Sequence, residues 1–113
     1  MWENTIITHK IGEVRMRGGY SILREIHRKD FMPNGKDYGL LDYEFDNMIR
    51  FLEKQGYLER VLRVGDAYSL KPAKLTLKGL QLLKDKSDYE ETYPARNGLI
   101  EWVRSEKEHY SNC

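Results

Sequence analysis

The sequence contains one cysteine, Cys113, which stands at the C-terminal end. A single thiol cannot form an internal disulfide, so this residue is expected to be a spectator. Histidine is scarce too. His9, His27 and His109 lie far apart in the sequence and share no ligand spacing, which argues against a metal site. We therefore expect no metal and no other cofactor.

Long apolar runs are also missing. No stretch approaches the roughly 20 residues that span a bilayer, and the N-terminus lacks the apolar core of a signal peptide. We expect a cytoplasmic protein without a membrane partner. Catalytic patterns are absent too: there is no nucleophile elbow and no Cys/His pair with an orienting group. The Gly-rich stretch 17–20 lacks the spacing and the lysine of a phosphate loop. We predict no catalytic residues and no enzymatic activity.

Neither sign of charge dominates. Nineteen basic residues face eighteen acidic ones, and this balance is mild evidence against a dedicated nucleic-acid binder. The distribution is uneven, since 1–29 and 58–86 carry a basic excess and 30–57 and 87–113 an acidic one. With 113 residues, 40% of them hydrophobic, the chain suits one domain with a modest core.

The clearest pattern lies in residues 41–58, which predict one long helix followed by a strand. Its apolar residues recur at i, i+3, i+4 and i+7, which gathers them on one helix face: Phe45, Met48, Ile49 and Leu52. Asp42 is a candidate cap, because a carboxylate can accept the free amide hydrogens of the first turn. Gly56 is expected to end the helix in a left-handed conformation.

A shorter helix is predicted on the N-terminal side, at 20–29, after a break at Gly18-Gly19. Its inward residues are Ile22, Leu23 and Ile26, and its outward residues are Arg24, Glu25 and Arg28. A turn at 31–35 follows it, and 36–40 has room for one or two helical turns. Residues 1–17 suit a helix or a strand, and their apolar load predicts packing on this domain or on a second copy.

On the C-terminal side, 57–64 and 67–70 predict a hairpin joined by Gly65-Asp66, a pair that suits a type II′ turn. A connector at 71–74 leads to a helix that Thr76 caps, with Leu80 and Leu83 expected on its inner face. An acidic linker at 88–91 and a last helix at 94–105 complete the chain.

This order predicts an α+β, mainly α fold: a winged helix-turn-helix with a two-stranded wing and an added C-terminal helix. We divide the chain into an N-terminal extension (1–17), the winged domain (18–86), and a final part with the linker, the last helix and a frayed tail (87–113).

Four stretches also resemble one family, the YjcQ family of short winged-helix proteins from bacilli and their prophages. They are Tyr20-Ser-Ile-Leu-Arg-Glu-Ile, Phe45-Asp-Asn-Met-Ile-Arg-Phe-Leu-Glu-Lys-Gln-Gly-Tyr-Leu, Leu75-Thr-Leu-Lys-Gly and Ile100-Glu-Trp-Val. The resemblance covers about 18–105 and is most specific in the central helix, whereas the Leu-Thr-x-Lys-Gly turn is common in winged helices. It implies a winged-helix fold and, because the family's role is poorly defined, no particular activity.

The first functional hypothesis is a transcriptional regulator that binds double-stranded DNA. In a winged helix-turn-helix the third helix lies in the major groove and the wing touches the backbone or the minor groove. A projection of the central helix leaves four suitable side chains on its outer face: Tyr43, Asn47, Arg50 and Lys54. The wing and connector would add Arg60, Arg63, Lys71 and Lys74.

The outer face of this helix is also compatible with an ordinary solvated surface. Asp46 precedes Arg50 by four residues, the favourable orientation for a surface ion pair. Glu44, Asp46 and Glu53 border the face and would repel phosphate.

The second hypothesis is a protein-interaction module, a phage or host adaptor that does not bind DNA. The chain carries more aromatic residues than one small core needs, and aromatic side chains anchor interfaces. Trp2 and Trp102 are the candidate anchors, although the helical spacing of Trp102 with Leu99 favours packing on its own domain. A homodimer through the terminal segments fits both hypotheses.

Overall fold

The computed structural model describes the backbone of residues 16–111 and the side chains of residues 16–105. The fold is α+β and mainly α, as the sequence predicts. A first helix covers 16–28 and is followed by η1 (Gly35–Tyr38), α2 (Asp42–Lys54), β1 (Leu58–Glu59), β2 (Leu62–Val64), β3 (Ala67–Ser69), β4 (Lys74–Leu75), α3 (Leu77–Asp85), η2 (Ser87–Glu91), η3 (Arg96–Gly98) and α4 (Leu99–Ser111).

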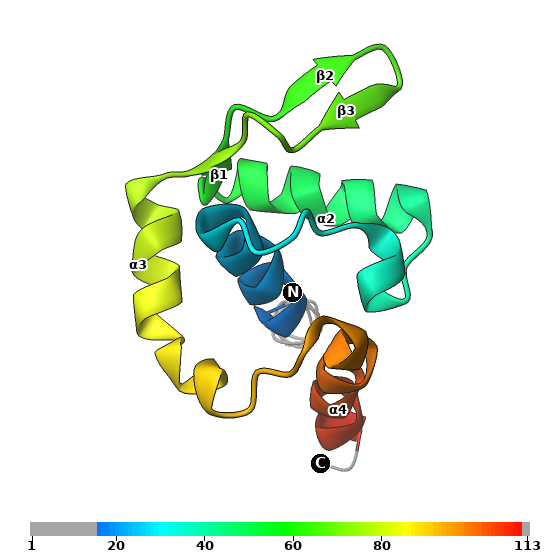
Figure 1. Ribbon diagram of the computed structural model, residues 1–113, viewed down its shortest axis with the longest axis vertical. Helices are drawn as coiled ribbons and strands as arrows, with labels where there is room; N and C mark the ends of the chain where they lie inside the picture. Colours follow the sequence, from blue (N-terminus) through cyan, green and yellow to red (C-terminus); the bar gives the residue numbers. More distant parts are fainter. Residues whose placement is uncertain (1–15, 112–113) are drawn as a thin grey trace, which may run out of the picture.

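The first helix lies at the centre of the molecule, with α2 across it, α3 along another side and α4 beyond the short η1 turn (Figure 1). α4 packs against η1. The β2–β3 hairpin rises past α2 at the top of the view. This arrangement leaves α2 with one face on the core and the other open.

The core follows the predicted stripes. Its most deeply buried side chains come from the first helix, α2 and α4: Ile22, Leu23, Ile49, Leu52 and Leu99. In α3 half of the predicted inner face is confirmed. Leu83 is half-buried and packs against the core, but Leu80 is 38% exposed, and Leu82, which was not predicted, is buried at 8% exposure. Thr76 caps this helix as predicted, since its Oγ1 accepts a hydrogen bond from Gly79 N at 3.0 Å.

The predicted break at Gly18-Gly19 is wrong, because the first helix runs through both glycines. The reason is close packing on α2. A Cβ on Gly18 would lie 3.0 Å from Met48 Cε, and one on Gly19 would lie 3.3 Å from Leu52 Cδ2. The two glycines leave room for the Met48 and Leu52 side chains of α2, and this packing outweighs their poor helix propensity.

The start of α2 also differs from the prediction. Asp42 is the first helical residue, and the N-cap position is held by Leu41, whose side chain has no acceptor. Glu44 Oε1 instead accepts the amide hydrogen of Leu41 at 2.8 Å, so the carboxylate that satisfies this terminus lies three residues after the cap. The predicted end of α2 is confirmed, because Gly56 follows the helix in a left-handed conformation, with φ +83°.

The hairpin is confirmed, with a modification. Gly65 has φ +60° at the first turn position, as a type II′ turn requires, and Arg63 stands opposite Tyr68. The predicted continuous strand 57–64 is interrupted at Arg60, which has φ +65°. The two residues before this kink form β1, which pairs with β4, so Lys74 belongs to a strand and not to a connector.

Two further predictions about the C-terminal part need correction. The linker at 88–91 is part of η2, and Glu90 is ion-paired with Arg24 at 2.7 Å rather than simply solvated. The last helix begins at Leu99 instead of Pro94, after the η3 turn.

Candidate nucleic-acid interface

The outer face of α2 carries the four side chains that the helical projection selected. Tyr43 is 65% exposed and Arg50 has 59% of its side chain exposed, and Asn47 and Lys54 are exposed as well. Their spacing of four, three and four residues places them in one row along the helix. We call this row the α2 crest.

Arg50 is partly engaged, as the sequence predicts. Its Nε donates to Asp46 Oδ2 at 3.1 Å, an i,i+4 pair on the helix surface. The two terminal amino groups of its guanidinium carry no partner among the described side chains, 16–105, and arginine uses these groups for bidentate contacts to guanine in DNA complexes.

Arg63 does not point away from the helix as a free wing residue. Its two terminal amino groups donate to Asp46 Oδ1 at 2.9 Å and to Glu53 Oε1 at 2.6 Å, and its side chain is only 25% exposed. The alternation of β2 explains this orientation, because Leu62 and Val64 point outward while the residue between them faces α2. The Tyr68 ring lies 5.4 Å from the same guanidinium.

These contacts alter the charge of α2. Burial opposes ionisation of Asp46, but the hydrogen bonds from Arg63 and Arg50 hold its pKa below the usual value. The hydrogen bond to Glu53 raises the pKa of Arg63. Two of the three acids that border the crest, Asp46 and Glu53, are thus paired with two arginines, whereas Glu44 accepts from the Leu41 amide, and Lys54 has no ion-pair partner among the described side chains. The phosphate repulsion expected from Asp46 and Glu53 is therefore weakened.

The remaining predicted cations lie apart from this cluster. Arg60 and Lys74 are exposed near the base of the hairpin, at the β1–β4 pair. Lys71 lines a separate cavity with Lys29, at the end of the first helix. The structure thus joins one of the four predicted wing and connector residues, Arg63, directly to α2.

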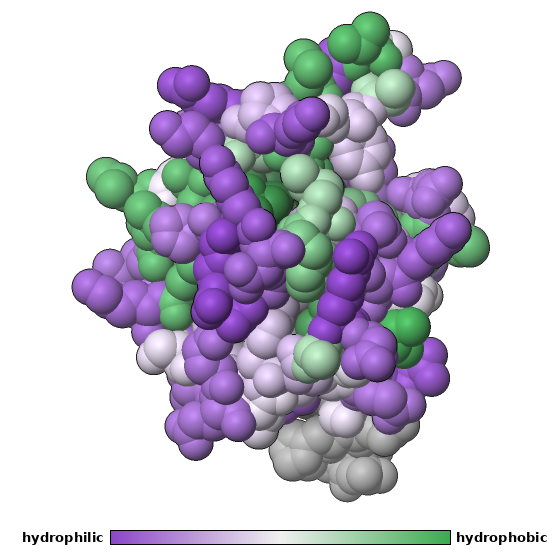
Figure 2. All heavy atoms as spheres, in the orientation of Figure 1, coloured by the Kyte–Doolittle hydropathy of each residue, from purple (hydrophilic) through white to green (hydrophobic). Residues whose placement is uncertain are grey.

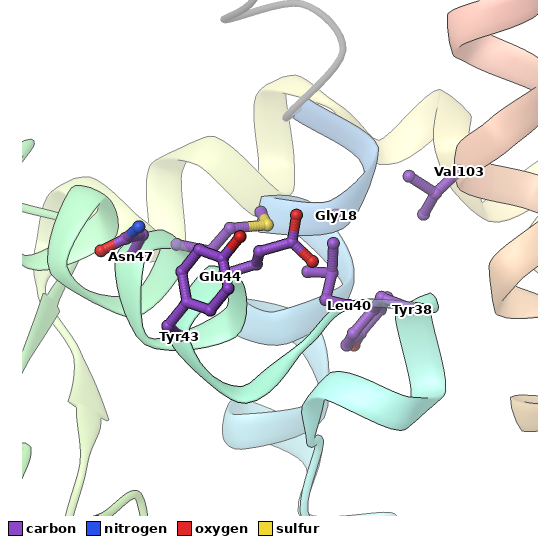
Figure 3. A pocket seen from close by; sticks show the side chains of 8 residues that line it. Gly18, Tyr38, Leu40, Tyr43, Glu44, Asn47 and Val103 are labelled. Atoms are coloured by element: carbon purple, nitrogen blue, oxygen red, sulfur yellow. The ribbon is translucent and has the colours of Figure 1, made fainter.

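A cavity of about 350 Å³ lies beside the crest, which sequence reasoning missed (Figure 3). Tyr43, Glu44 and Asn47 enter it from α2, and Val103 points toward it from α4. Its walls come from the first helix, η1, α2 and α4, so no local sequence signal marks it. Two crest residues, Tyr43 and Asn47, therefore line a cavity in addition to facing solvent.

Trp102 is buried at 6% exposure and is not a surface anchor. Its ring packs edge-on against Tyr89 and Tyr93, and its Nε1 donates to Thr92 Oγ1 at 2.9 Å. The predicted packing of this residue on its own domain is confirmed. Trp2 lies outside the described residues.

Glu25 is also internal, contrary to the outward position predicted from the helical pattern. It is 1% exposed, and its Oε2 accepts from the Tyr93 hydroxyl at 2.6 Å and from Arg24 Nη1 at 2.7 Å. Ser21 is buried next to it and hydrogen-bonds Tyr38 and Tyr93, each at 2.8 Å. The polar cluster forms because η1 and the 92–95 segment fold over this side of the first helix, which the sequence pattern of the helix alone does not reveal.

Among the described side chains, 16–105, no three His, Cys, Asp or Glu residues gather as metal ligands would. Within residues 16–111, every helix is too short or too polar to cross a bilayer.

No protein-family model and no solved structure matches the sequence. Among curated proteins, the chain is similar to the uncharacterised protein YjcQ of Bacillus subtilis (strain 168). The two are 30% identical over 88 residues, which cover 75% of this chain and 93% of YjcQ. A relationship of this extent agrees with the resemblance noted in the sequence, and the chain belongs to the YjcQ family.

Proposed function

We propose that this protein is a winged helix-turn-helix regulator that binds double-stranded DNA through the α2 crest. The observation that carries the proposal is the exposed crest together with the Arg63 bridge, which offsets the two acids beside it. The order of elements supports it too: the first helix, the η1 turn and α2 follow each other as the three helices of such a domain do, and the hairpin stands where the wing would be.

Each crest residue has a role in this proposal. Arg50 presents its free amino groups to a guanine edge, and Asn47 can pair with adenine. Tyr43 and Lys54, at the two ends of the row, contact phosphates and fix the register of the helix in the groove. Arg60, Lys71 and Lys74 supply further positive charge for the backbone, whereas Arg63 acts indirectly by holding Asp46 and Glu53.

The test is retention of a duplex that carries the gene's own upstream region, followed by gel shift or fluorescence anisotropy. Affinity should fall steeply between low and moderate salt, because phosphate contacts release counterions. Arg50→Ala with Lys54→Ala should abolish the preference for that duplex over a scrambled one. Arg28→Ala with Lys84→Ala is the matched control, since it removes the same two charges from exposed positions elsewhere.

The control double variant should keep the sequence preference. If the wild-type protein binds no duplex in a salt-sensitive manner, the DNA-binding proposal is wrong.

A protein-interaction module is the second candidate, and one observation favours it. Leu62 and Val64 are 53% and 69% exposed on the outer face of the hairpin, where apolar atoms gather at the top of Figure 2. An exposed apolar ribbon is a common element of protein interfaces. If this candidate holds, Leu62→Ser with Val64→Thr should abolish recovery of a stoichiometric protein partner from host lysate, while DNA retention is absent.

Both candidates allow a homodimer through the terminal segments, and in the DNA-binding candidate such a dimer would present two α2 helices to two half-sites. Light scattering coupled to size-exclusion chromatography measures the number of copies directly.

A further inference from the structure

The cavity beside the α2 crest has the size and the wall chemistry of a small-molecule site. Its volume of about 350 Å³ falls within the range of ligand pockets, which is about 300–1,000 Å³. The first helix, η1, α2 and α4 all contribute to its wall (Figure 3). Most of this wall is apolar or aromatic, from Tyr38, Leu40, Tyr43, Met48 and Val103. The cavity can therefore bury the apolar part of a small ligand.

One charged side chain, Glu44, lines the cavity. It is half-buried, and Figure 3 shows it extending from α2 with its carboxylate group directed toward Gly18 and Leu40, which line the cavity as well. Its Oε1 accepts the Leu41 amide hydrogen at 2.8 Å, which holds the carboxylate in place. Its Oε2 remains accessible and has no partner among the described residues. One carboxylate oxygen is thus positioned by the start of α2 and available to a ligand.

No basic side chain balances this carboxylate. None of the eight residues that line the cavity is a lysine, an arginine or a histidine. An anion would therefore be repelled by Glu44. A neutral apolar ligand would displace water from the charged Oε2 and offer it no hydrogen bond in return. An organic cation with an apolar body suits both the carboxylate and the walls.

We propose that this cavity binds a primary amine that carries an apolar or aromatic body. The ammonium group donates a charge-assisted hydrogen bond to Glu44 Oε2, and the apolar body packs against Leu40, Met48 and Val103. Tyr43 lines the same cavity, and an aromatic ring there favours a cation over a neutral group. This binding does not depend on whether α2 contacts DNA.

Isothermal titration of the full chain with three probes tests the proposal. The probes 4-phenylbutylamine, 4-phenylbutan-1-ol and 4-phenylbutanoate share a phenyl ring and a four-carbon chain and differ in the charge of the end group. The amine should bind saturably with a Kd below about 1 mM. The alcohol and the carboxylate should each bind at least about tenfold more weakly, because neither can form a charge-assisted hydrogen bond with Glu44 as a cation does.

Glu44→Gln removes the negative charge but leaves an amide oxygen that can still accept the Leu41 amide hydrogen, so the start of α2 is kept. This variant should bind the amine at least about tenfold more weakly and bind the alcohol as the wild type does. Asp42→Asn is the matched control, since it removes the same charge from an exposed side chain of α2 that does not line the cavity. At physiological salt it should bind the amine within about twofold of the wild type.

Val103→Phe tests the cavity itself. Val103 points toward the cavity from α4, and a phenyl ring in its place would take up part of the space that the ligand needs (Figure 3). All three probes should bind at least about tenfold more weakly to this variant. A thermal melt checks that the variant is folded, and the comparison of Glu44→Gln with Asp42→Asn tests the proposal independently of it.

Two residues of the cavity, Tyr43 and Asn47, also belong to the α2 crest. If α2 binds DNA as proposed, amine and duplex compete for these side chains, and this consequence rests on the proposed function. With the amine at about three times its Kd, mutually exclusive binding lowers the DNA affinity about fourfold in the wild type and about 1.3-fold or less in Glu44→Gln. Fluorescence anisotropy measures both ratios, and equal ratios would refute the competition. The titrations contain no DNA, so failure of DNA binding and failure of amine binding are distinguished.

Four results would overturn the proposal of an amine site. The first is no saturable binding of the amine. The second is equal binding of the amine and the alcohol, which would indicate an apolar pocket without selection for charge. The third is equal loss of amine binding in Glu44→Gln and Asp42→Asn, which would indicate a general effect of charge. The fourth is unchanged binding of the amine to a folded Val103→Phe variant, which would place the amine elsewhere on the protein.

Discussion

Replacement of Arg63 by methionine is the sharpest test of how this surface is built. Methionine keeps an unbranched apolar stem but removes the guanidinium, and with it both hydrogen bonds, at 2.9 Å to Asp46 and 2.6 Å to Glu53, and the contact with the Tyr68 ring. The side chain is one-quarter exposed, so solvent reduces the value of each charged contact. We expect a loss of about 1–2 kcal/mol in the free energy of unfolding.

Urea unfolding followed by circular dichroism measures this loss. Arg28→Met is the matched control: the Arg28–Asp30 pair is 3.2 Å long, and both side chains are about half exposed. That substitution should change stability by less than about 0.5 kcal/mol. Equal stability of the two variants would show that the bridge between the hairpin and α2 contributes nothing.

If α2 binds DNA as proposed, the same substitution should weaken that binding, even though Arg63 faces α2 and not the outer face of the helix. It makes the α2 surface one charge more negative, and one charge about 7 Å from a phosphate is worth about 0.6 kcal/mol in water. With one or two phosphates at that distance, affinity should fall about three- to eightfold at low salt. Fluorescence anisotropy with a labelled duplex measures the change.

Neutralising the acids distinguishes the two possible roles of this arginine. If Arg63 acts by offsetting them, then adding Asp46→Asn and Glu53→Gln to Arg63→Met should restore wild-type affinity or exceed it. If Arg63 itself contacts DNA, the triple variant should bind more than about eightfold more weakly than the double variant Asp46→Asn with Glu53→Gln, and the electrostatic reasoning is refuted.

Two other predictions concern the fold. Gly79→Ala should destabilise the protein by about 2–4 kcal/mol, because the new Cβ would lie 2.2 Å from the Tyr57 carbonyl oxygen, which also accepts a hydrogen bond from Thr76 N. A thermal melt measures the loss, Lys84→Ala in the same helix is the control, and a Gly79→Ala variant that melts no lower than wild type would contradict the packing described here. The second prediction concerns pH. The hydrogen bond from Arg24 lowers the pKa of Glu90 below its usual value, although burial opposes this shift. The Arg24–Glu90 ion pair therefore contributes its full stabilisation above the unfolded-state pKa of Glu90. This stabilisation is lost as the pH falls through the lower folded-state pKa. Urea unfolding between about pH 5 and pH 2 should therefore show a steeper loss of stability in the wild type than in Glu90→Gln, and parallel curves would exclude this contribution.

Much of the fold could be predicted because it rests on local rules. The α2 stripe needs only the 3.6-residue period, the Thr76 cap needs only the free amide groups of one helix turn, and the turns at Gly56 and Gly65 need only a residue that accepts positive φ. Exposure of the crest follows from the same period, since a helix that buries one face shows the other to solvent.

The errors arose where a distant part of the chain decides the outcome. Gly18-Gly19 would break an isolated helix, but α2 packs so closely that the missing side chains become an advantage. Glu25 lies on what the helical pattern marks as a solvent face, until Tyr93 and its neighbours cover it. The hydrophobic pattern of the first helix alone predicts neither of these contacts.

The candidate interface divides in the same way. The sequence by itself determined which α2 residues face outward, because side-chain direction along a helix is a property of its own backbone. Only the tertiary structure decided the charge of that face, because the kink at Arg60 and the alternation of β2 turn Arg63 back onto Asp46 and Glu53. That pairing joins residues 10 and 17 positions apart, and no local pattern in the sequence specifies it.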